Sequence, residues 1–428
     1  MTESRGFSYA VVLAAAFALW IPVALFGAGG YSVLLALAAI PAAFFVSWRG
    51  GISRLAIAVL LLVAWSAISS LWSDETGQIM SGDLAQGDFG INAAGLRILL
   101  TAIAGILTVA ACLRIRSQAR IAAGFIILVI LTHGILMLLM GLLPDTALSA
   151  YAPFSDPVKE APQNILRSAN AFFLGLPLLI GAAWCLPAPW RYPAAAASFL
   201  LGAATFLLLR SDVALLGMVF VALASAVVMI FRKNGFRILI GFVALAVVSS
   251  PIVLGAAAPM VVHSDLPLQA SSKSRIFAWS LAARKVEERP LVGHGIEASK
   301  EWRETFAEEP DLLELMREST DLTGIPWEKY RILPGHPHNM GLQLWAETGL
   351  VGVLLGCAVL FLLALALPSP AMLGAPLALA TAGLIGASFS LFSLSYSVWN
   401  EAFWANMVLS AAAIIVLGKA RPRREPAE

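Results

Sequence analysis

Residues 331–356 read RILPGHPHNMGLQLWAETGLVGVLLG. A turn with Pro334, Gly335 and Pro337 carries two histidines, and an apolar run follows it from about residue 339 to 365. A run of that length crosses the hydrocarbon core of a bilayer as a single helix. The stretch therefore predicts a membrane span whose polar beginning, with His336 and His338, lies at the membrane surface.

The rest of the chain has the same character. Of its 428 residues, 59% are apolar and 13% are charged, whereas soluble domains are about 45–50% apolar and about 25% charged. Apolar runs long enough to span recur along the sequence, which predicts an all-α, polytopic integral membrane protein with about 12 transmembrane helices. The expected spans are residues 9 to 27, 31 to 48, 54 to 72, 93 to 113, 121 to 143, 168 to 187, 192 to 209, 213 to 231, 236 to 257, 339 to 365, 371 to 390 and 398 to 418.

The N-terminal run follows a single arginine, Arg5. This pattern is open to a cleavable signal peptide, but we expect a retained first span because so many spans follow it.

The basic residues indicate the orientation of the spans. They fall on alternate connections, which the positive-inside rule assigns to the cytoplasm together with both termini. The acidic residues of the two medium loops fall on the opposite side. The basic set is Arg5, Arg49, Arg54, Arg114, Arg116, Arg120, Arg191, Arg232, Lys233, Arg237, Lys419, Arg421, Arg423 and Arg424; the acidic set is Asp74, Glu75, Asp83, Asp88, Asp145, Asp156 and Glu160.

One noncytoplasmic loop is large, and it divides the chain. We expect a transmembrane bundle over 1–257 (spans 1–9), a loop subdomain over 258–338, a second part of the bundle over 339–418 (spans 10–12) and a basic cytoplasmic tail over 419–428. Within the loop, SRIFAWSLAARKVEERP (274–290) has apolar residues at helical spacing opposite charged ones, and 297–318 has a similar pattern. Both segments are predicted to be amphipathic helices.

Three arginines near the noncytoplasmic span ends are candidates for ligand binding: Arg167, Arg210 and Arg275. The planar guanidinium fork suits a phosphate or diphosphate group. The alternative for each is an anchor that extends from the membrane into water. Arg210 also has Asp212 nearby as a structural partner.

His338 is a candidate base. It is predicted to lie in the first turn of the span, where the positive end of the helix dipole favours neutral imidazole, and a neutral imidazole can take a proton from a hydroxyl group. The alternative is a histidine that only caps the helix. His336 is expected to support His338. No metal is expected, because the pair lacks a nearby carboxylate or cysteine that would complete a set of ligands.

Two further patterns follow His338. Asn339, Gln343 and Glu347 recur every four residues as a polar stripe, about 100° round the helix from His338. Such a stripe faces protein or water, not lipid. The nearby glycines, including Gly349 and Gly352, are expected to form a face for close helix packing.

The patterns also bear on the reaction class. Transporters carry ionisable residues and broken helices near the membrane centre, whereas here the polar residues gather at one face. The sequence has no D-x-D pair, no phosphate-binding P-loop and no G-x-S-x-G. We therefore expect no cofactor, and a reaction whose energy comes from the substrate.

Several stretches resemble a known family. HPHNMGLQLWAETGLVGVLL (336–355) resembles the H-N-x-x-L-Q-x-x-x-E-x-G-x-x-G pattern of the bacterial O-antigen ligase and O-antigen polymerase superfamily. RIFAWSLAARKVEERPLVGHGIEA (275–298) is similar to the R-x-x-x-W and P-L-x-G-x-G stretch that precedes it in that family. SSLWSDET (69–76) and RSANAFFLGLPL (167–178) are weaker matches.

The resemblance implies a metal-independent, inverting glycosyltransferase of the GT-C kind in the bacterial inner membrane, with its site facing the periplasm. The implied donor is a glycan on undecaprenyl diphosphate, and the acceptor is a hydroxyl group of lipid A core oligosaccharide, in lipopolysaccharide synthesis. His338 would match the catalytic histidine and Arg275 the loop arginine that binds the diphosphate. The second arginine of the family follows a serine, but here Asp212 follows Ser211, and Arg210 precedes it.

Three alternatives remain open. An O-antigen or exopolysaccharide polymerase would use an acceptor that is still on undecaprenyl diphosphate. Polymerases more often have two sizeable periplasmic loops, so the single large loop favours the ligase. A ligase for protein acceptors and a transporter of polyprenyl-linked glycans are the other two.

Overall fold

The computed structural model describes residues 8–26, 29–46, 51–74, 80–81, 90–91, 93–154, 156, 160–262, 268–318 and 324–421. Several charged residues used for the expected orientation lie outside these ranges: Arg5, Arg49, Glu75, Asp83, Asp88, Arg423 and Arg424.

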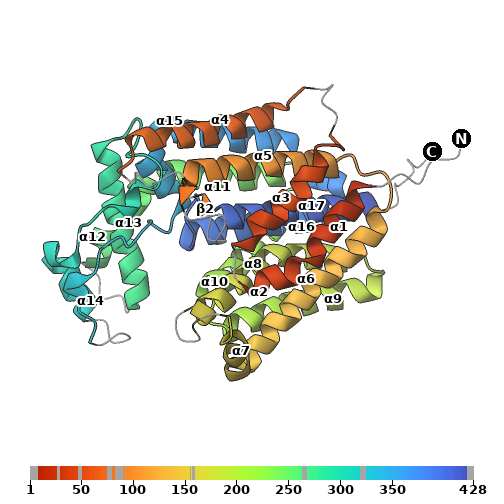
Figure 1. Cartoon of the computed structure of the whole chain (residues 1–428), viewed down its shortest axis with the longest axis horizontal. Helices are drawn as coiled ribbons and strands as arrows, with labels where there is room; N and C mark the ends of the chain where they lie inside the picture. Colours follow the sequence, from red (N-terminus) through yellow and green to blue (C-terminus); the bar gives the residue numbers. More distant parts are fainter. Residues whose placement is uncertain are drawn as a thin grey trace, which may run out of the picture.

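The described part of the chain is almost entirely helical, with ten helices long and apolar enough to cross a membrane. The prediction of a polytopic, all-α membrane protein is confirmed, and most helices lie side by side in one bundle (Figure 1). They are α4 (Arg54–Ile68), which the 3-10 turn η2 (Ser69–Trp72) continues, α5 (Ala94–Cys112), α6 (Ala119–Leu142), α8 (Glu160–Ala183), α9 (Ala188–Leu208), α10 (Asp212–Ile230), α11 (Gly235–Gly255), α15 (Met340–Ala366), α16 (Pro370–Leu394) and α17 (Glu401–Ala420).

The first two expected spans are shorter apolar helices. The run from 9 to 27 forms α1 (Tyr9–Ala18) and α2 (Trp20–Leu25), and the run from 31 to 48 forms α3 (Gly30–Ala42). Pro41 lies in the last turn of α3, where a proline disfavours continuation of the helix. The Tyr9 hydroxyl donates a hydrogen bond of 2.9 Å to the Ala38 carbonyl and so fixes α1 against α3.

Helices α8, α10 and α16 pack closely because glycines line their contacts. A Cβ atom at Gly181 of α8 would lie 2.7 Å from the Pro376 carbonyl oxygen in α16, and one at Gly386 of α16 would lie 2.7 Å from the Phe220 carbonyl oxygen in α10. In a membrane protein such small residues let helix backbones approach each other. This trio forms much of the buried interior.

The large loop carries α12 (Ala257–Val262), α13 (Ala270–Glu288), α14 (Pro310–Arg317) and the 3-10 turns η4 (Ala298–Lys300), η5 (Phe306–Glu308) and η6 (Trp327–Lys329). It lies at the end of the bundle opposite the two termini (Figure 1). Its apolar core includes Phe277, Trp302 and Phe306, and it also takes in Leu342 and Ala346 of α15. The loop therefore shares its core with the membrane helices.

The first amphipathic helix of this loop is confirmed as α13, but the prediction of one helix over 297–318 is wrong. Glu297 adopts a left-handed conformation with φ of 60°. Thr305 is extended and starts η5 through a capping box with Glu308. Pro310, which has no N–H to donate, begins the separate helix α14. Local capping signals therefore override the apolar periodicity.

One short helix and a pair of short strands complete the described fold. Helix α7 (Pro144–Tyr151) follows α6. The strands β1 (Met80–Ser81) and β2 (Gly90–Ile91) pair in antiparallel fashion, with Met80 opposite Ile91.

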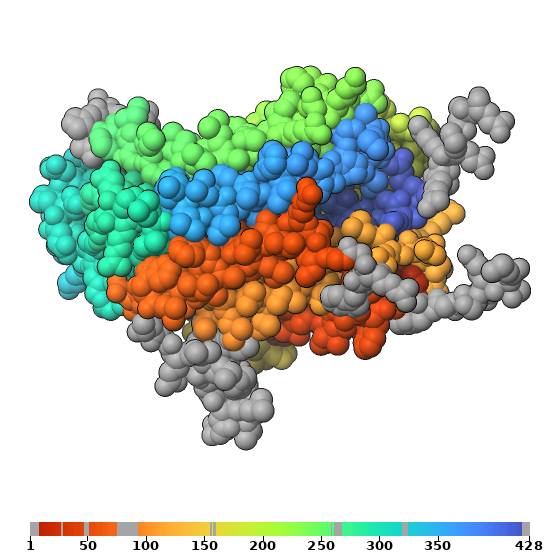
Figure 2. All heavy atoms as spheres, turned by 90° about the horizontal axis from the view of Figure 1, so that it is seen from above, coloured from red at the N-terminus to blue at the C-terminus, as the bar shows by residue number. Residues whose placement is uncertain are grey.

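Helix α15 is broken at Gly349, which has φ of 64° and ψ of −167°. The backbone of residues 290–295 fills the break: His294 N–H donates to the Ala346 carbonyl at 2.9 Å, and Leu350 N–H donates to the Pro290 carbonyl at 2.9 Å. Figure 2 shows α15, in blue, between α11, in green, and α4, in orange-red. Gly349 thus permits close approach, but to a loop and not to the neighbouring helix that the sequence led us to expect.

Glycine is required at this contact from both sides. A Cβ atom at Gly349 would lie 2.4 Å from the Leu291 carbonyl carbon, and one at Gly293 would lie 2.4 Å from the Glu347 carbonyl carbon. Gly293 also has a positive φ of 67°, which costs other residues free energy. This explains the glycines of the P-L-x-G-x-G stretch in physical terms.

We predict that Gly349→Ala lowers the stability of the purified protein by about 2–4 kcal/mol, since it adds backbone strain and a steric overlap. Thermal unfolding in detergent measures the effect. Gly124→Ala in α6 is the matched control, because a Cβ atom there meets nothing within 4 Å. Equal melting temperatures for the two variants would contradict the interpretation of the break.

Candidate functional site

Four segments that are distant in sequence meet at the end of the bundle beside the large loop. They are the turn before α15, the first half of α13, the connection between α16 and α17, and the beginning of α10. His338 contacts Ser395, the charge of Arg275 acts on His338, and the charge of Asp212 acts on Arg275. This meeting point is the candidate site.

His338 lies one residue before the N-cap of α15, which is Asn339, and not in the first turn of the helix as expected. Its backbone is left-handed, with φ of 51°. The ring Nδ1 lies 2.7 Å from the Ser395 carbonyl oxygen. A carbonyl oxygen only accepts hydrogen bonds, so Nδ1 carries the proton and Nε2 keeps its lone pair. The imidazole is thereby oriented as a base.

The neutral state expected of His338 has a physical cause in the structure, and this cause differs from the one predicted. Burial lowers the pKa of His338 below its ordinary value, the bond to Ser395 opposes this shift, and the Arg275 guanidinium lowers the pKa further. Desolvation disfavours the charged imidazolium and is the largest cause of the lowered pKa of His338. The ring is therefore a neutral base near pH 7.

His336 supports His338 through the backbone. Its Nδ1 accepts a hydrogen bond of 3.1 Å from the His338 N–H, and the two ring centroids are 4.2 Å apart. Burial lowers the pKa of His336 to about 3, with smaller contributions from His338 and Lys300. A neutral His336 is needed for this bond, because imidazolium has no acceptor nitrogen. His336 thus helps hold the left-handed conformation of His338.

Arg275 extends from the first half of α13. Burial lowers the pKa of Arg275, and the Asp212 carboxylate opposes the shift. Asp212 lies in the first turn of α10. Among the residues that the structure describes, none forms an ion pair with Arg275 within 4.0 Å. A partly buried cation therefore lies within electrostatic range of the neutral imidazole, which is a combination suited to an anionic ligand.

Arg167 and Arg210 are exposed. Arg210 is left-handed, with φ of 53°, in the turn between α9 and α10, and Arg167 extends from α8 close enough to influence Tyr396. No hydrogen bond or ion pair in the described ranges engages either guanidinium. No described contact joins either of them directly to His338.

The polar stripe of α15 holds the connection between α16 and α17. Asn339 caps α15 by accepting a bond of 3.0 Å from the Leu342 N–H, and it donates one of 3.2 Å to the Ser393 carbonyl. Gln343 donates 2.9 Å to Ser397 Oγ and accepts 2.9 Å from the Val398 N–H. The stripe and His338 therefore bind the same segment, although they lie on different sides of the turn.

Glu347 is fully buried in the middle of α15. Its carboxylate accepts hydrogen bonds from Ser299 Oγ at 2.5 Å, from the Glu297 N–H at 2.8 Å and from Gln343 Nε2 at 3.2 Å, and a further one from Trp399 Nε1. It thus joins the large loop to the approach of α17. Such a buried carboxylate persists only when several donors satisfy it.

A second polar network lies beside Ser395. Asn170 of α8 donates a hydrogen bond of 2.8 Å to the Tyr396 hydroxyl, and its carbonyl oxygen accepts one of 2.7 Å from Ser211 Oγ. At one end of the network, Tyr396 follows Ser395, whose carbonyl binds His338. At the other end, Ser211 precedes Asp212, whose charge acts on Arg275. The network therefore links the two parts of the candidate site. The site residues predicted from the sequence did not include Tyr396, Ser395 or Asn170. A polar triplet SYS between apolar runs was the available signal.

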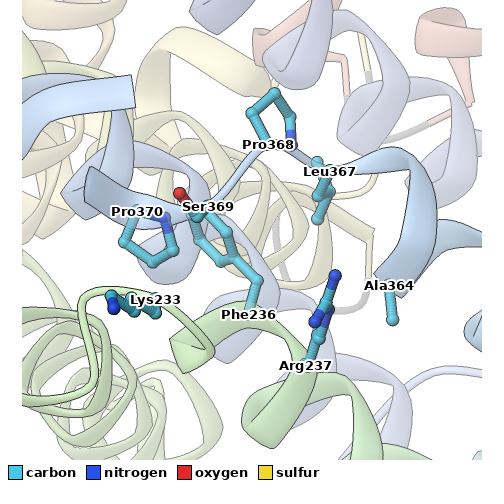
Figure 3. Close-up of a pocket in the computed structure, with 8 residues that line it drawn as sticks. All are labelled: Lys233, Phe236, Arg237, Ala364, Leu367, Pro368, Ser369 and Pro370. Carbon is cyan, nitrogen blue, oxygen red and sulfur yellow. The ribbon is translucent and has the colours of Figure 1, made fainter. Parts of the chain in front are cut away.

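The hollow in Figure 3 is a different feature. It is lined by Lys233, Phe236, Arg237, Ala364 and residues 367–370. Helix α10 begins beside Arg275 and ends at Ile230, so its rise of 1.5 Å per residue separates the hollow from the candidate site by roughly 27 Å. The hollow is therefore at the other end of the bundle. Within the described ranges, no group of three or more His, Cys, Asp or Glu residues is arranged to hold a metal ion.

Comparison with known proteins gives a consistent picture. Residues 197–357 match the family model described as O-antigen ligase. Three proteins named "Putative polysaccharide ligase" are similar: one of Rickettsia conorii (28% identity over 31% of this chain and 30% of that protein), one of Rickettsia bellii (32% over 26% and 24%) and one of Rickettsia prowazekii (29% over 36% and 33%). The matches span a third or less of each relative's length.

We predict that stability falls as the pH drops below about 6.5. Burial lowers the pKa of both site histidines, so the unfolded chain binds more protons than the folded chain below the ordinary histidine pKa. His336→Gln keeps an acceptor for the His338 N–H and removes one titrating group. The variant should lose about 2 kcal/mol less stability than the wild type between pH 7.5 and pH 5. Thermal unfolding across that range tests this, and parallel pH profiles would contradict it.

Proposed function

We propose that this chain is a member of the O-antigen ligase family, whose model matches residues 197–357, and that it transfers a glycan from undecaprenyl diphosphate to a hydroxyl group of lipid A core oligosaccharide. The observation that carries the proposal is the pairing of a neutral, oriented His338 with the partly buried cation of Arg275. The first is suited to an acceptor hydroxyl and the second to a diphosphate.

In the proposed reaction, the acceptor hydroxyl oxygen attacks the anomeric carbon of the donor glycan. A new carbon–oxygen bond forms, and the bond from that carbon to the diphosphate breaks. The diphosphate leaves with the electron pair, and its growing negative charge is stabilised by Arg275, assisted by Arg210. His338 Nε2 takes the acceptor proton. Attack opposite the leaving group inverts the anomeric centre, as in an inverting GT-C glycosyltransferase.

The location of the site supports an arrangement across the bacterial inner membrane. The basic residues of the hollow in Figure 3 lie at the end of the bundle opposite His338, and basic ends face the cytoplasm. We therefore propose that both termini are cytoplasmic and that His338 and Arg275 face the periplasm. Both lipid-linked substrates would then reach the site from the outer leaflet.

A transporter of the same lipid-linked glycans is less well supported. The break in α15 and the buried Glu347 resemble features of transport proteins. However, Glu347 is held by donors from the large loop, from α15 and from the approach of α17. A carboxylate satisfied in this way is a structural joint and is not free to bind and release an ion.

We predict that His338→Ala lowers transfer by about 100-fold or more, because general base catalysis contributes about 10²- to 10⁴-fold. The variant is expressed in cells whose own ligase is deleted, and lipopolysaccharide is examined on a gel. His294→Ala is a control for loss of a buried histidine outside the site. Normal O-antigen ladders from His338→Ala at normal protein abundance would rule out the catalytic role.

The same assay tests the donor site. Arg275→Lys keeps the positive charge but loses the planar fork, so we predict about a 10- to 100-fold fall in kcat/KM for the lipid-linked donor. Arg284→Lys is the matched control on α13, since Arg284 is exposed and pairs with Glu309 at 2.8 Å. Equal kcat/KM values for the two variants would contradict the role of Arg275.

A purified reaction in EDTA and without ATP tests the proposed independence of metal and of added energy. Transfer to core acceptor under these conditions is expected. Growth of lipid-linked polymer without core acceptor would instead identify the polymerase of the same superfamily.

A further inference from the structure

The Tyr396 hydroxyl has an unused hydrogen-bond donor at the candidate site. A phenol group has one O–H donor and accepts through its oxygen. Asn170 Nδ2 donates to that oxygen at 2.8 Å, and no described residue accepts the O–H. Tyr396 is partly exposed, whereas Asn170 is 4% exposed. The free donor therefore belongs to the open side of the network.

The position of the hydroxyl is fixed from three directions. The ring stacks on Phe403, with centroids 3.7 Å apart. Asn170 holds the oxygen, and Ser211 Oγ fixes the Asn170 amide by donating to its carbonyl oxygen at 2.7 Å. The backbone is held one residue earlier, where the Ser395 carbonyl binds His338. A donor held this firmly gives up little freedom when a ligand binds.

The surroundings indicate an anionic ligand. Arg167 precedes Asn170 by one turn of α8, and its charge acts on Tyr396. Arg210 immediately precedes Ser211. The bond between Asn170 and Ser211 therefore links the phenol group to two segments that carry exposed arginines, α8 with Arg167 and the turn before α10 with Arg210. Arg275, beside Asp212, extends the same positive region toward His338.

The phenol stays protonated at this position. Burial raises the pKa of Tyr396 to about 12, although the Asn170 bond and Arg167 oppose the shift. The hydroxyl is then a donor throughout the pH range in which His338 is a neutral base.

We propose that the Tyr396 hydroxyl donates a hydrogen bond to a phosphate oxygen of the lipid-linked donor, held in place by Asn170 and Ser211. The proposal rests on the proposed function and adds a substrate-binding residue to it. Tyr396 supplies a neutral donor near Arg167, so it would stabilise the leaving diphosphate without adding a further cation. It also joins the diphosphate side of the site to the His338 side, through adjacent residues of one segment.

The test is Tyr396→Phe, which removes the hydroxyl and keeps the ring that stacks on Phe403. We expect the affinity for undecaprenyl diphosphate, measured with the purified protein, to fall by about 10- to 100-fold, as is typical for a bond to a charged group. KM for core acceptor should stay unchanged. Tyr192→Phe, at an exposed tyrosine of α9, is the matched control.

A purely structural role makes a different prediction. It would lower the melting temperature of Tyr396→Phe and leave the affinity for undecaprenyl diphosphate unchanged, which would overturn the proposal. A change confined to KM for the core acceptor would also overturn it, because the phosphate would then belong to the acceptor. Asn170→Ala, which frees the hydroxyl but does not remove it, should weaken binding less than Tyr396→Phe.

The proposed function can fail separately. If wild-type protein transfers no glycan from the lipid-linked donor, the ligase proposal is wrong whatever Tyr396 does. If wild-type protein transfers glycan and Tyr396→Phe binds undecaprenyl diphosphate as tightly as wild type, only the role of Tyr396 is wrong.

Discussion

The candidate site depends on one buried carboxylate, that of Glu347. A carboxylate inside a membrane protein costs several kcal/mol unless donors surround it. Here those donors are the Glu297 N–H and Ser299 of the large loop, Gln343 of α15, and Trp399 before α17. Since all of these donors bind one carboxyl group, the three segments cannot separate independently. The turn with His338, the segment with Ser395 and Tyr396, and the loop that carries Arg275 are all adjacent to this joint.

Some groups at the site only hold its structure, and others are free to bind a ligand. The carboxylate joint and the break in α15 use backbone groups and buried polar side chains, which leaves them no capacity to bind a ligand. The groups with a free donor or acceptor are His338 Nε2, the Tyr396 hydroxyl and the exposed guanidinium groups of Arg167 and Arg210. A site of this kind is preorganised, because the groups that meet the substrate are held by others that do not.

Much of the fold could be predicted from the sequence. Twelve spans were predicted from length and apolar composition alone, since a helix in lipid must satisfy its own backbone, and ten of them form long apolar helices in the described part of the chain. The break at Gly349 was not, because its cause is the backbone of 290–295, far away in sequence. The same limit applies to the site: His338 and Arg275 were found from motifs, whereas the partnership of Asn170, Ser211 and Tyr396 exists only once α8, α10 and the segment before α17 are packed. The prediction of one helix over 297–318 was wrong for a local reason, because Pro310 in the sequence already indicates that a new helix begins there.

The break in α15 has a consequence for how the chain enters the membrane. The residues that fill the break, 290–295, precede α15 in the chain. Their backbone pairs with the Ala346 and Glu347 carbonyl groups and with the Leu350 and Val351 N–H groups, which in lipid would lack partners if the break formed before 290–295 docked. A continuous helix pairs such groups within itself, so we expect α15 to enter the membrane unbroken and to bend when 290–295 dock. Glycine at 349 allows both shapes, so the final bend is an event of tertiary assembly that follows insertion.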